Sequence, residues 1–227
     1  MRPFSELINT EDPAWPMVQE WIADARNPVE VLPVNPVDRD AALLATQVTT
    51  RSPMGAIVYE TGGLLIDHGW LRILGSGHPR LPRSLPSWNK GRTMFDDENP
   101  PGYLLVADDV VGGFFAVNGG ALGPEMGTVF YFAPDSLEWE RMEFGYSQFI
   151  VWCLQGNVTM FYESLRWPGW EDEISTLNGD QAIFIFPFLS TKGPALEQRH
   201  HGVVPIAEMF ALHVSGDAAP ENPSPNA

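Results

Sequence analysis

The sequence predicts an α+β fold organised around a central antiparallel meander at about 103–132. This stretch, YLLVADDVVGGFFAVNGGALGPEMGTVFYF, contains three apolar runs rich in β-branched and aromatic residues. Asp108-Asp109 separates the first run from the second, and Asn118-Gly119-Gly120 helps separate the second from the third. Short runs divided by Asp, Asn and Gly are typical of strands joined by tight turns. Amphipathic segments on both sides of the meander predict helices that pack against the sheet.

Three helices are predicted before the meander. The first spans 13–25 and follows two acidic residues, which favour a helix start. The second begins at Pro36 behind the capping residue Asn35, and the third begins at Pro53 and ends at Gly62-Gly63. The apolar stripe expected to be buried on the second helix consists of Ala41, Leu44, Ala45 and Val48.

Two short strands and a long loop are predicted between these helices and the meander. Leu64–Asp67 and Trp70–Leu74 flank His68-Gly69, which suits a hairpin turn. Gly75–Thr93 has several prolines and little periodicity, so we interpret it as an ordered loop that includes a helical turn. Phe95–Pro101 is expected to form an acidic turn that leads into the meander.

The chain after the meander alternates between predicted strands and helices. The predicted elements are a strand at 137–141, a helix capped by Ser147, a helix from Asn157 to Leu165, a short helix at 171–177, a strand at 181–188, a polar loop at 190–202 and a strand at 206–214. The last thirteen residues lack an apolar pattern. We therefore expect one α+β domain at 1–214 and a disordered tail at 215–227.

The charge of the chain is strongly acidic, with 13 basic and 29 acidic residues and a net charge of −16. Such a surface repels phosphate backbones, so we expect no direct contact with nucleic acid. It suits a basic protein partner, although acidity also serves solubility alone. The N-terminal residues lack the apolar core of a secretory signal and no segment is long enough to span a membrane, so a cytoplasmic protein is expected.

Standard catalytic and cofactor motifs are missing from the sequence. Gly75-Ser-Gly77 lacks the third glycine of a dinucleotide-binding loop, and no phosphate-binding loop ending in Gly-Lys-Ser/Thr occurs. Ser147 has phenylalanine where a nucleophile elbow needs glycine, and Cys153 lies on an apolar helix face. The five histidines show no metal-binding spacing. We expect no cofactor and no metal, and an enzymatic role is less favoured than binding.

Aromatic and charged residues supply the candidate binding residues. Arg166, Trp167 and Trp170 surround a Pro-Gly turn and suit an interface if the rings are exposed, whereas rings folded onto the core would be structural. Asp108 and Asp109 are assigned to the same partner-binding set. The loop 75–93 is a basic island that either grips an acidic ligand or forms internal salt bridges. A ligand pocket there, alternative to the partner site, would use His68, His78, Arg80 and Trp88.

The residues also resemble a known family. LINTEDPAWPMVQEWI, YLLVADDVVGGFFAVNGG, VFYFAPDSLEWE and LRWPGWEDEI, together with the segment at 48–89, are similar to the bacterial domain-of-unknown-function family 2625 over about 7–214. That resemblance supplies no catalytic residues. Thr61-Gly62-Gly63, Ala107-Asp108-Asp109 with Gly112-Gly113, Val129 with Asp135, and Phe149 resemble the pattern of the SUKH superfamily, many of whose members neutralise toxins. The SUKH resemblance implies a strongly bent antiparallel sheet with helices mainly on one side.

Three hypotheses on function follow. The first is a non-enzymatic protein-binding module, with a basic toxin as a possible partner under the SUKH resemblance. The second is a small-molecule-binding protein or an enzyme with a novel site near residues 67–89. The third is a scaffold or oligomer subunit without a ligand; the oligomeric state is left open.

Overall fold

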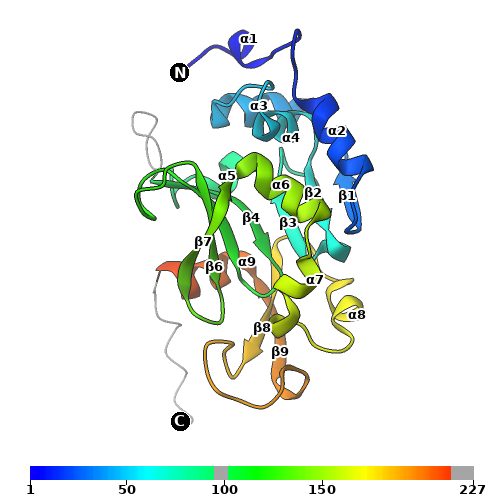
Figure 1. The fold of residues 1–227 in the computed structure, drawn as a ribbon, viewed down its shortest axis with the longest axis vertical. Coiled ribbons are helices and arrows are strands. Elements are labelled where there is room, and N and C mark those ends of the chain that lie inside the picture. Colours follow the sequence, from blue (N-terminus) through cyan, green and yellow to red (C-terminus); the bar gives the residue numbers. More distant parts are fainter. Residues whose placement is uncertain (95–101, 216–227) are drawn as a thin grey trace, which may run out of the picture.

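The computed structural model describes residues 1–94 and 102–215 and has an α+β architecture (Figure 1). Seven strands form one antiparallel sheet in chain order, so each strand pairs with the next along the chain. They are β1 (Val29–Leu32), β2 (Gly63–Ile66), β3 (Leu71–Leu74), β4 (Tyr103–Asp109), β5 (Phe114–Asn118), β6 (Thr128–Ala133) and β7 (Glu138–Gly145). A separate two-stranded ribbon contains β8 (Gln181–Phe186) and β9 (His200–Pro205). The predicted meander is confirmed as β4–β6.

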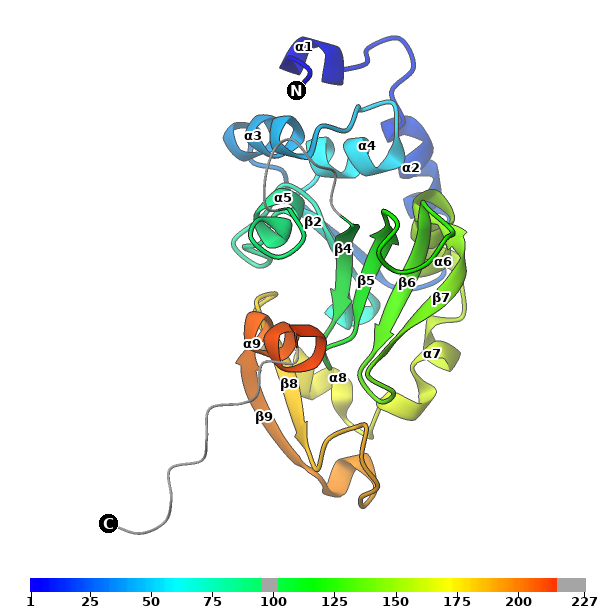
Figure 2. The ribbon, with the colours of Figure 1, turned by 90° about the vertical axis from the view of Figure 1, so that its left-hand side faces the viewer.

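Nine α-helices of the described residues surround this sheet. They are α1 (Phe4–Leu7), α2 (Trp15–Ala23), α3 (Pro36–Thr46), α4 (Pro53–Glu60), α5 (Leu85–Asn89), α6 (Tyr146–Gln155), α7 (Val158–Phe161), α8 (Trp170–Ile174) and α9 (Ile206–Phe210). The N-terminal helices lie at one end of the molecule and the β8–β9 ribbon lies at the opposite end (Figures 1 and 2). Asn35 and Ser52 cap α3 and α4 as the sequence predicts, with proline at the first helical position of each.

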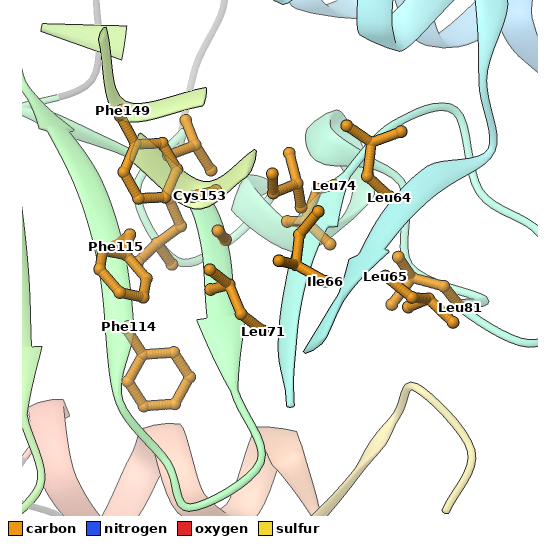
Figure 3. Packing of buried hydrophobic residues seen from close by; sticks show 14 of the residues in the cluster. Leu64, Leu65, Ile66, Leu71, Leu74, Leu81, Phe114, Phe115, Phe149 and Cys153 are labelled. Carbon is orange, nitrogen blue, oxygen red and sulfur yellow. The ribbon is translucent and has the colours of Figure 1, made fainter. Parts of the chain in front are cut away.

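Both faces of the central strands are buried, which explains their continuous apolar sequences. Phe114 and Phe115 are neighbours on β5, and consecutive side chains of a strand point to opposite faces. Phe115 packs against Phe149 of α6, whereas Phe114 packs against Trp88 of α5 and Phe210 of α9 (Figure 3). Helices α2 and α4 contact α6 on the Phe115 side. Helices α2, α4 and α6 therefore share one side, but α5 and α9 cover the other.

Close backbone contact explains the Gly-Gly pair that follows α4. A Cβ atom on Gly62 would lie 2.8 Å from the carbonyl oxygen of Gly77 and 2.9 Å from that of Pro33. A Cβ atom on Gly75 would lie 2.6 Å from the backbone nitrogen of Gly63. The residues after α4 and after β3 thus pack backbone to backbone, which only glycine permits. This contact fixes the start of the loop 75–93 against α4.

Three of the predicted local structures are wrong. The segment 206–214 is not a strand, because Ile206, Met209 and Phe210 are buried at helical spacing and form α9 followed by one π-helical turn. The segment 190–202 is not a loop throughout, because its last residues from His200 onward belong to β9. This strand pairs with β8, and its side chains are exposed or half-buried, so its sequence lacks the apolar pattern of a buried strand. Ser147 does not cap α6, whose N-cap position is Gly145.

Several other outcomes concern the connecting segments. The connector after α2 contains β1, an edge strand bracketed by Pro28 and Pro33, where proline is tolerated. The loop 75–93 contains α5, so its predicted helical turn is confirmed. The expected acidic turn at 95–101 and the tail from 216 onward lie outside the described residues. Among the described residues, no helix combines the length and apolar character needed to cross a bilayer.

Candidate functional site

A buried ion network lies where β3 and β4 pair. The antiparallel register places Arg72 opposite Asp108. The Arg72 guanidinium donates from Nε to Oδ1 of Asp108 at 2.7 Å, and its Nη2 forms an ion pair with the same oxygen at 2.6 Å while donating to the carbonyl oxygen of Asp109 at 3.1 Å. Arg83 Nη1 donates to Oδ2 of Asp108 at 2.6 Å. Asp108 is fully buried and Arg72 is 2% exposed. Burial lowers the pKa of Arg72.

The same network fastens two distant segments to the sheet. Arg83 also donates to Asp180 Oδ1 at 2.7 Å and to the carbonyl oxygen of Gly179 at 2.6 Å. Arg72 donates to the carbonyl oxygen of Gln181 at 2.6 Å. Arg83 therefore joins the loop 75–93 directly to the turn before β8 and, through Asp108, to the sheet. For Arg83, the internal salt-bridge interpretation of the basic island is the correct one.

Asp109 is engaged inside the protein as well. Its Oδ1 accepts from the backbone N–H groups of Val111 and Gly113, at 3.0 and 2.8 Å, and its Oδ2 accepts from the Tyr131 hydroxyl at 2.7 Å. Burial raises the pKa of Asp109. The assignment of Asp108 and Asp109 to an exposed partner surface is wrong, because both side chains are fully buried and hydrogen-bonded.

A second charged pair lies at the turn between β2 and β3. Asp67, His68 and Gly69 all adopt positive φ, at 51°, 61° and 89°, and form a short 3₁₀ turn. The Asp67 carboxylate accepts from Arg166 Nη2 at 2.5 Å, although 99 residues separate them. Two non-glycine residues in the left-handed region strain this turn, a feature that clusters at functional sites. The turn holds the Asp67 carboxylate beside the Arg166 side chain.

Aromatic rings surround the Arg166 guanidinium. Its central carbon lies 4.2 Å from the ring centroid of Trp170 and 4.7 Å from that of Trp70. Trp70 and Trp170 pack edge to face, with centroids 5.1 Å apart. Nε of Arg166 is buried and has no hydrogen-bond partner among the described residues. The guanidinium is thus held by ring faces and by one carboxylate.

Asp67, Arg166 and Trp170 line a surface hollow, which we call the acidic hollow, and its other lining residues come from the segment 157–171. Figure 1 shows where α7 and α8 of this segment lie. Its volume is about 630 Å³. Its lining comprises Asp67, Asn157, Thr159, Met160, Glu163, Arg166, Trp167, Pro168, Gly169, Trp170 and Glu171. Glu163, Glu171 and Met160 are exposed at its rim. Three carboxylates and one guanidinium therefore line it, and the guanidinium is already paired with Asp67.

The two candidate tryptophans take different positions in this hollow. Trp167 is 5% exposed and donates from Nε1 to Oε2 of Glu173 at 2.7 Å, while His201 Nδ1 contacts the same carboxylate at 3.0 Å. Trp167 is therefore folded onto the core. Trp170 is half-buried and keeps part of its ring at the hollow. Of the candidate partner-binding residues, Arg166, Trp167 and Trp170 thus lie together, and Asp108 and Asp109 lie elsewhere.

A larger groove is lined by α3 and by the loop that contains α5, and we call it the α3 groove. Figure 2 shows these two elements side by side. Its volume is about 970 Å³, and His78 is one of its lining residues. His68 lies at the other end of the β2–β3 hairpin, where it packs against Trp170. Trp88 is 3% exposed beneath Arg83 and Arg92, and Arg80 pairs with Glu30 on the surface. The alternative ligand set His68, His78, Arg80 and Trp88 therefore does not converge on one pocket.

Cys153 and the side chains that could bind a metal ion are the remaining groups of chemical interest. Cys153 is fully buried in α6, and burial raises the pKa of its thiol well above the ordinary range. Within residues 1–94 and 102–215, no group of three His, Cys, Asp or Glu side chains is arranged to hold a metal ion.

Sequence reasoning missed Asp67, Glu163 and Glu171 as members of the site. Glu163 lies three residues before Arg166, which was a usable signal for a shared surface. Asp67 could not be found in this way, because its contact with Arg166 depends on how α7 and α8 pack against the turn.

Comparisons with known proteins identify the family. The model of the family described as protein of unknown function DUF2625 matches residues 4–209. The uncharacterized protein YbfG of Escherichia coli (strain K12) is 48% identical over 212 residues, which cover 93% of this chain and 95% of YbfG. An uncharacterized protein of Haemophilus influenzae is 44% identical over 186 residues, covering 82% of this chain and 81% of its own. The chain belongs to the DUF2625 family, and the resemblance seen in the sequence is confirmed.

Proposed function

We propose that this member of the DUF2625 family is a cytoplasmic binding protein that holds a basic protein partner at the acidic hollow. The observation that carries the proposal is the composition of the hollow, where three carboxylates and the Trp170 ring surround a guanidinium that Asp67 already neutralises. A cationic side chain entering it would meet the exposed Glu163 and Glu171 carboxylates. The net charge of −16 would steer such a partner over longer distances.

The internal engagement of other reactive groups supports binding over catalysis. Asp108 and Asp109 are buried and hydrogen-bonded within the protein, and Cys153 is fully buried in α6. A general acid or nucleophile needs access to a substrate. Among basic proteins, a nuclease toxin is the class that the SUKH resemblance favours, because nucleases carry basic surfaces for nucleic acid.

A titration with a defined cation tests the proposal. The probe is a fluorescein-labelled hexa-arginine amide, followed by anisotropy against wild type and the double variant Glu163→Gln/Glu171→Gln. The matched control is Glu6→Gln/Glu197→Gln, which removes the same charge from exposed positions outside the hollow. Because exposed ion pairs contribute about 0.2–1 kcal/mol each, losing two of them should make the hollow variant bind about twofold to thirtyfold more weakly than the control.

The salt dependence and the native partner complete the test. Binding of the probe should weaken between low and high salt, since surface charges are screened. Equal losses in the hollow variant and the control would show that only net charge matters, and the assignment to the hollow would fall. With the hollow established, a pull-down from native lysate with wild type and with the double variant would identify the partner as the protein that only wild type retains.

A further inference from the structure

Helix α3 has two apolar faces, and only one of them is covered. Ala42 and Leu43 are buried against the rest of the protein. Ala41, Leu44 and Ala45 remain exposed, with 40% of the Leu44 side chain accessible to solvent. The predicted burial is therefore wrong for Ala41, Leu44 and Ala45, which form the uncovered face, whereas Val48 lies beyond the end of α3 and packs partly buried against the core. Apolar residues at this spacing on one helix face are the pattern by which helices pack on each other.

The uncovered face forms one wall of the α3 groove. The lining residues on α3 and its cap run from Asn35 to Ala45, a length of about 15 Å at 1.5 Å per residue. Dividing the groove volume of about 970 Å³ by this length gives a mean cross-section of about 65 Å², which corresponds to a circular channel about 9 Å across. The opposite wall presents the rings of Pro79, Pro82 and Pro86.

The groove also contains flexible methionine side chains and charged groups. Met1 and Met94 line it, and methionine side chains adjust to irregular apolar partners. Asp38 and Lys90 also line it, so its charged side chains are of both signs. The described residues that line the groove include no Phe, Tyr or Trp, and His78 supplies their one planar ring.

We propose that the α3 groove binds an amphipathic helix of a partner protein, about three turns long, with an apolar inner face and basic outer residues. A helix is about 10–12 Å across with its side chains, so its apolar face can enter a groove of this width while its polar face stays in solvent. The docked helix would then pack on α3 with the two axes about 8–10 Å apart, whereas a single alkyl chain would fill only part of the groove. The net charge of −16 on this protein favours a partner helix whose solvent-facing residues are basic. This docking mode is independent of the acidic hollow and goes beyond the proposed function.

A helical probe peptide with a scrambled control tests the proposal. The probe is a labelled 14-residue peptide of leucine and lysine with leucines at helical spacing, and the control has the same composition in an order without an apolar face. Leu44→Glu places a charge in the groove. Val37→Glu adds the same charge to the same helix at a position that is 79% exposed and outside the groove lining. Any general attraction of the added carboxylate for lysine is therefore equal in the two variants.

The expected result is that the helical peptide binds wild type and Val37→Glu alike, within about twofold, and binds Leu44→Glu at least about tenfold more weakly. Binding should induce helical circular dichroism in the peptide, and Glu163→Gln/Glu171→Gln should leave it unchanged. Equal binding of the scrambled peptide, or equal behaviour of the two α3 variants, would overturn the proposal. Displacement of the peptide by dodecyl maltoside without induced helicity would instead identify a site for alkyl chains.

Discussion

Replacing Asp108 with asparagine tests whether the buried ion network holds the sheet and the loop 75–93 together. The substitution preserves the shape of the side chain but removes its charge. In the native protein, Asp108 accepts one hydrogen bond from Arg72 and one from Arg83 and makes a further ion-pair contact with Arg72, all at 2.6–2.7 Å. In the variant, an amide NH₂ group faces guanidinium donors on one side, so at least one buried donor loses its acceptor.

The magnitude follows from the burial of the partners. Arg72 is 2% exposed and Arg83 is 7% exposed, so neither guanidinium can turn to solvent without unpacking the loop. Removing one member of a buried ion pair costs about 3–5 kcal/mol, because the remaining charge is buried without compensation. Since two arginines depend on Asp108, we expect a loss of at least about 3 kcal/mol in the free energy of unfolding.

Urea unfolding followed by far-ultraviolet circular dichroism and tryptophan fluorescence measures this loss. Glu30→Gln is the matched control, because it breaks the ion pair with Arg80, in which both side chains are about half exposed. That control should cost less than about 1 kcal/mol. A loss below about 1 kcal/mol for Asp108→Asn would refute the reasoning and show that the network adds no stability beyond what neutral hydrogen bonds supply.

Two further predictions concern buried titratable groups. Burial raises the pKa of Asp109, so the folded state holds the proton more tightly than the unfolded state; the resulting stabilisation is present below about pH 4 and is lost as the pH rises toward the folded-state pKa. Relative to Asp109→Asn, wild type should therefore lose unfolding free energy between pH 4 and 7 in parallel urea titrations, and a pH-independent difference would contradict this. Cys153 should react with a thiol reagent at pH 8 about 100-fold or more slowly in the native protein than in urea, because burial raises the pKa of the thiol and blocks access. Similar rates in both states would show that α6 opens readily.

The meander could be predicted from the sequence because its strands carry their own boundaries. Asp108-Asp109 and Asn118 mark the ends of β4 and β5, and the apolar runs between them have strand length. The prediction of a strand at 206–214 was wrong because this short apolar pattern fits both the two-residue period of a strand and the 3.6-residue period of a helix. Packing of Phe210 against Phe114 and Trp88 favours the helix.

The sequence indicates that β3 and β4 carry buried charges, but it does not show which charged residues pair with each other. Arg72 and Asp108 each interrupt an apolar strand, and a charge in such a position needs a partner. The partner itself depends on the register of β3 and β4, which joins residues 36 positions apart and cannot be derived from either strand alone. The same limit applies to Asp67 and Arg166 in the acidic hollow.

The failed prediction on α3 has a different cause, and it bears on function. Helical periodicity shows that a face is apolar, but it does not show which of two apolar faces the rest of the chain covers. In α3 the chain covers Ala42 and Leu43 and leaves Leu44 beside the α3 groove. An apolar helix face with the spacing of a buried stripe is expected to be covered in a fold selected for stability alone, and this face of α3 is exposed to solvent. Such departures concentrate where a protein meets its partners, so the Leu44→Glu and Val37→Glu comparison decides whether this one reflects binding or only tolerance of an exposed apolar face.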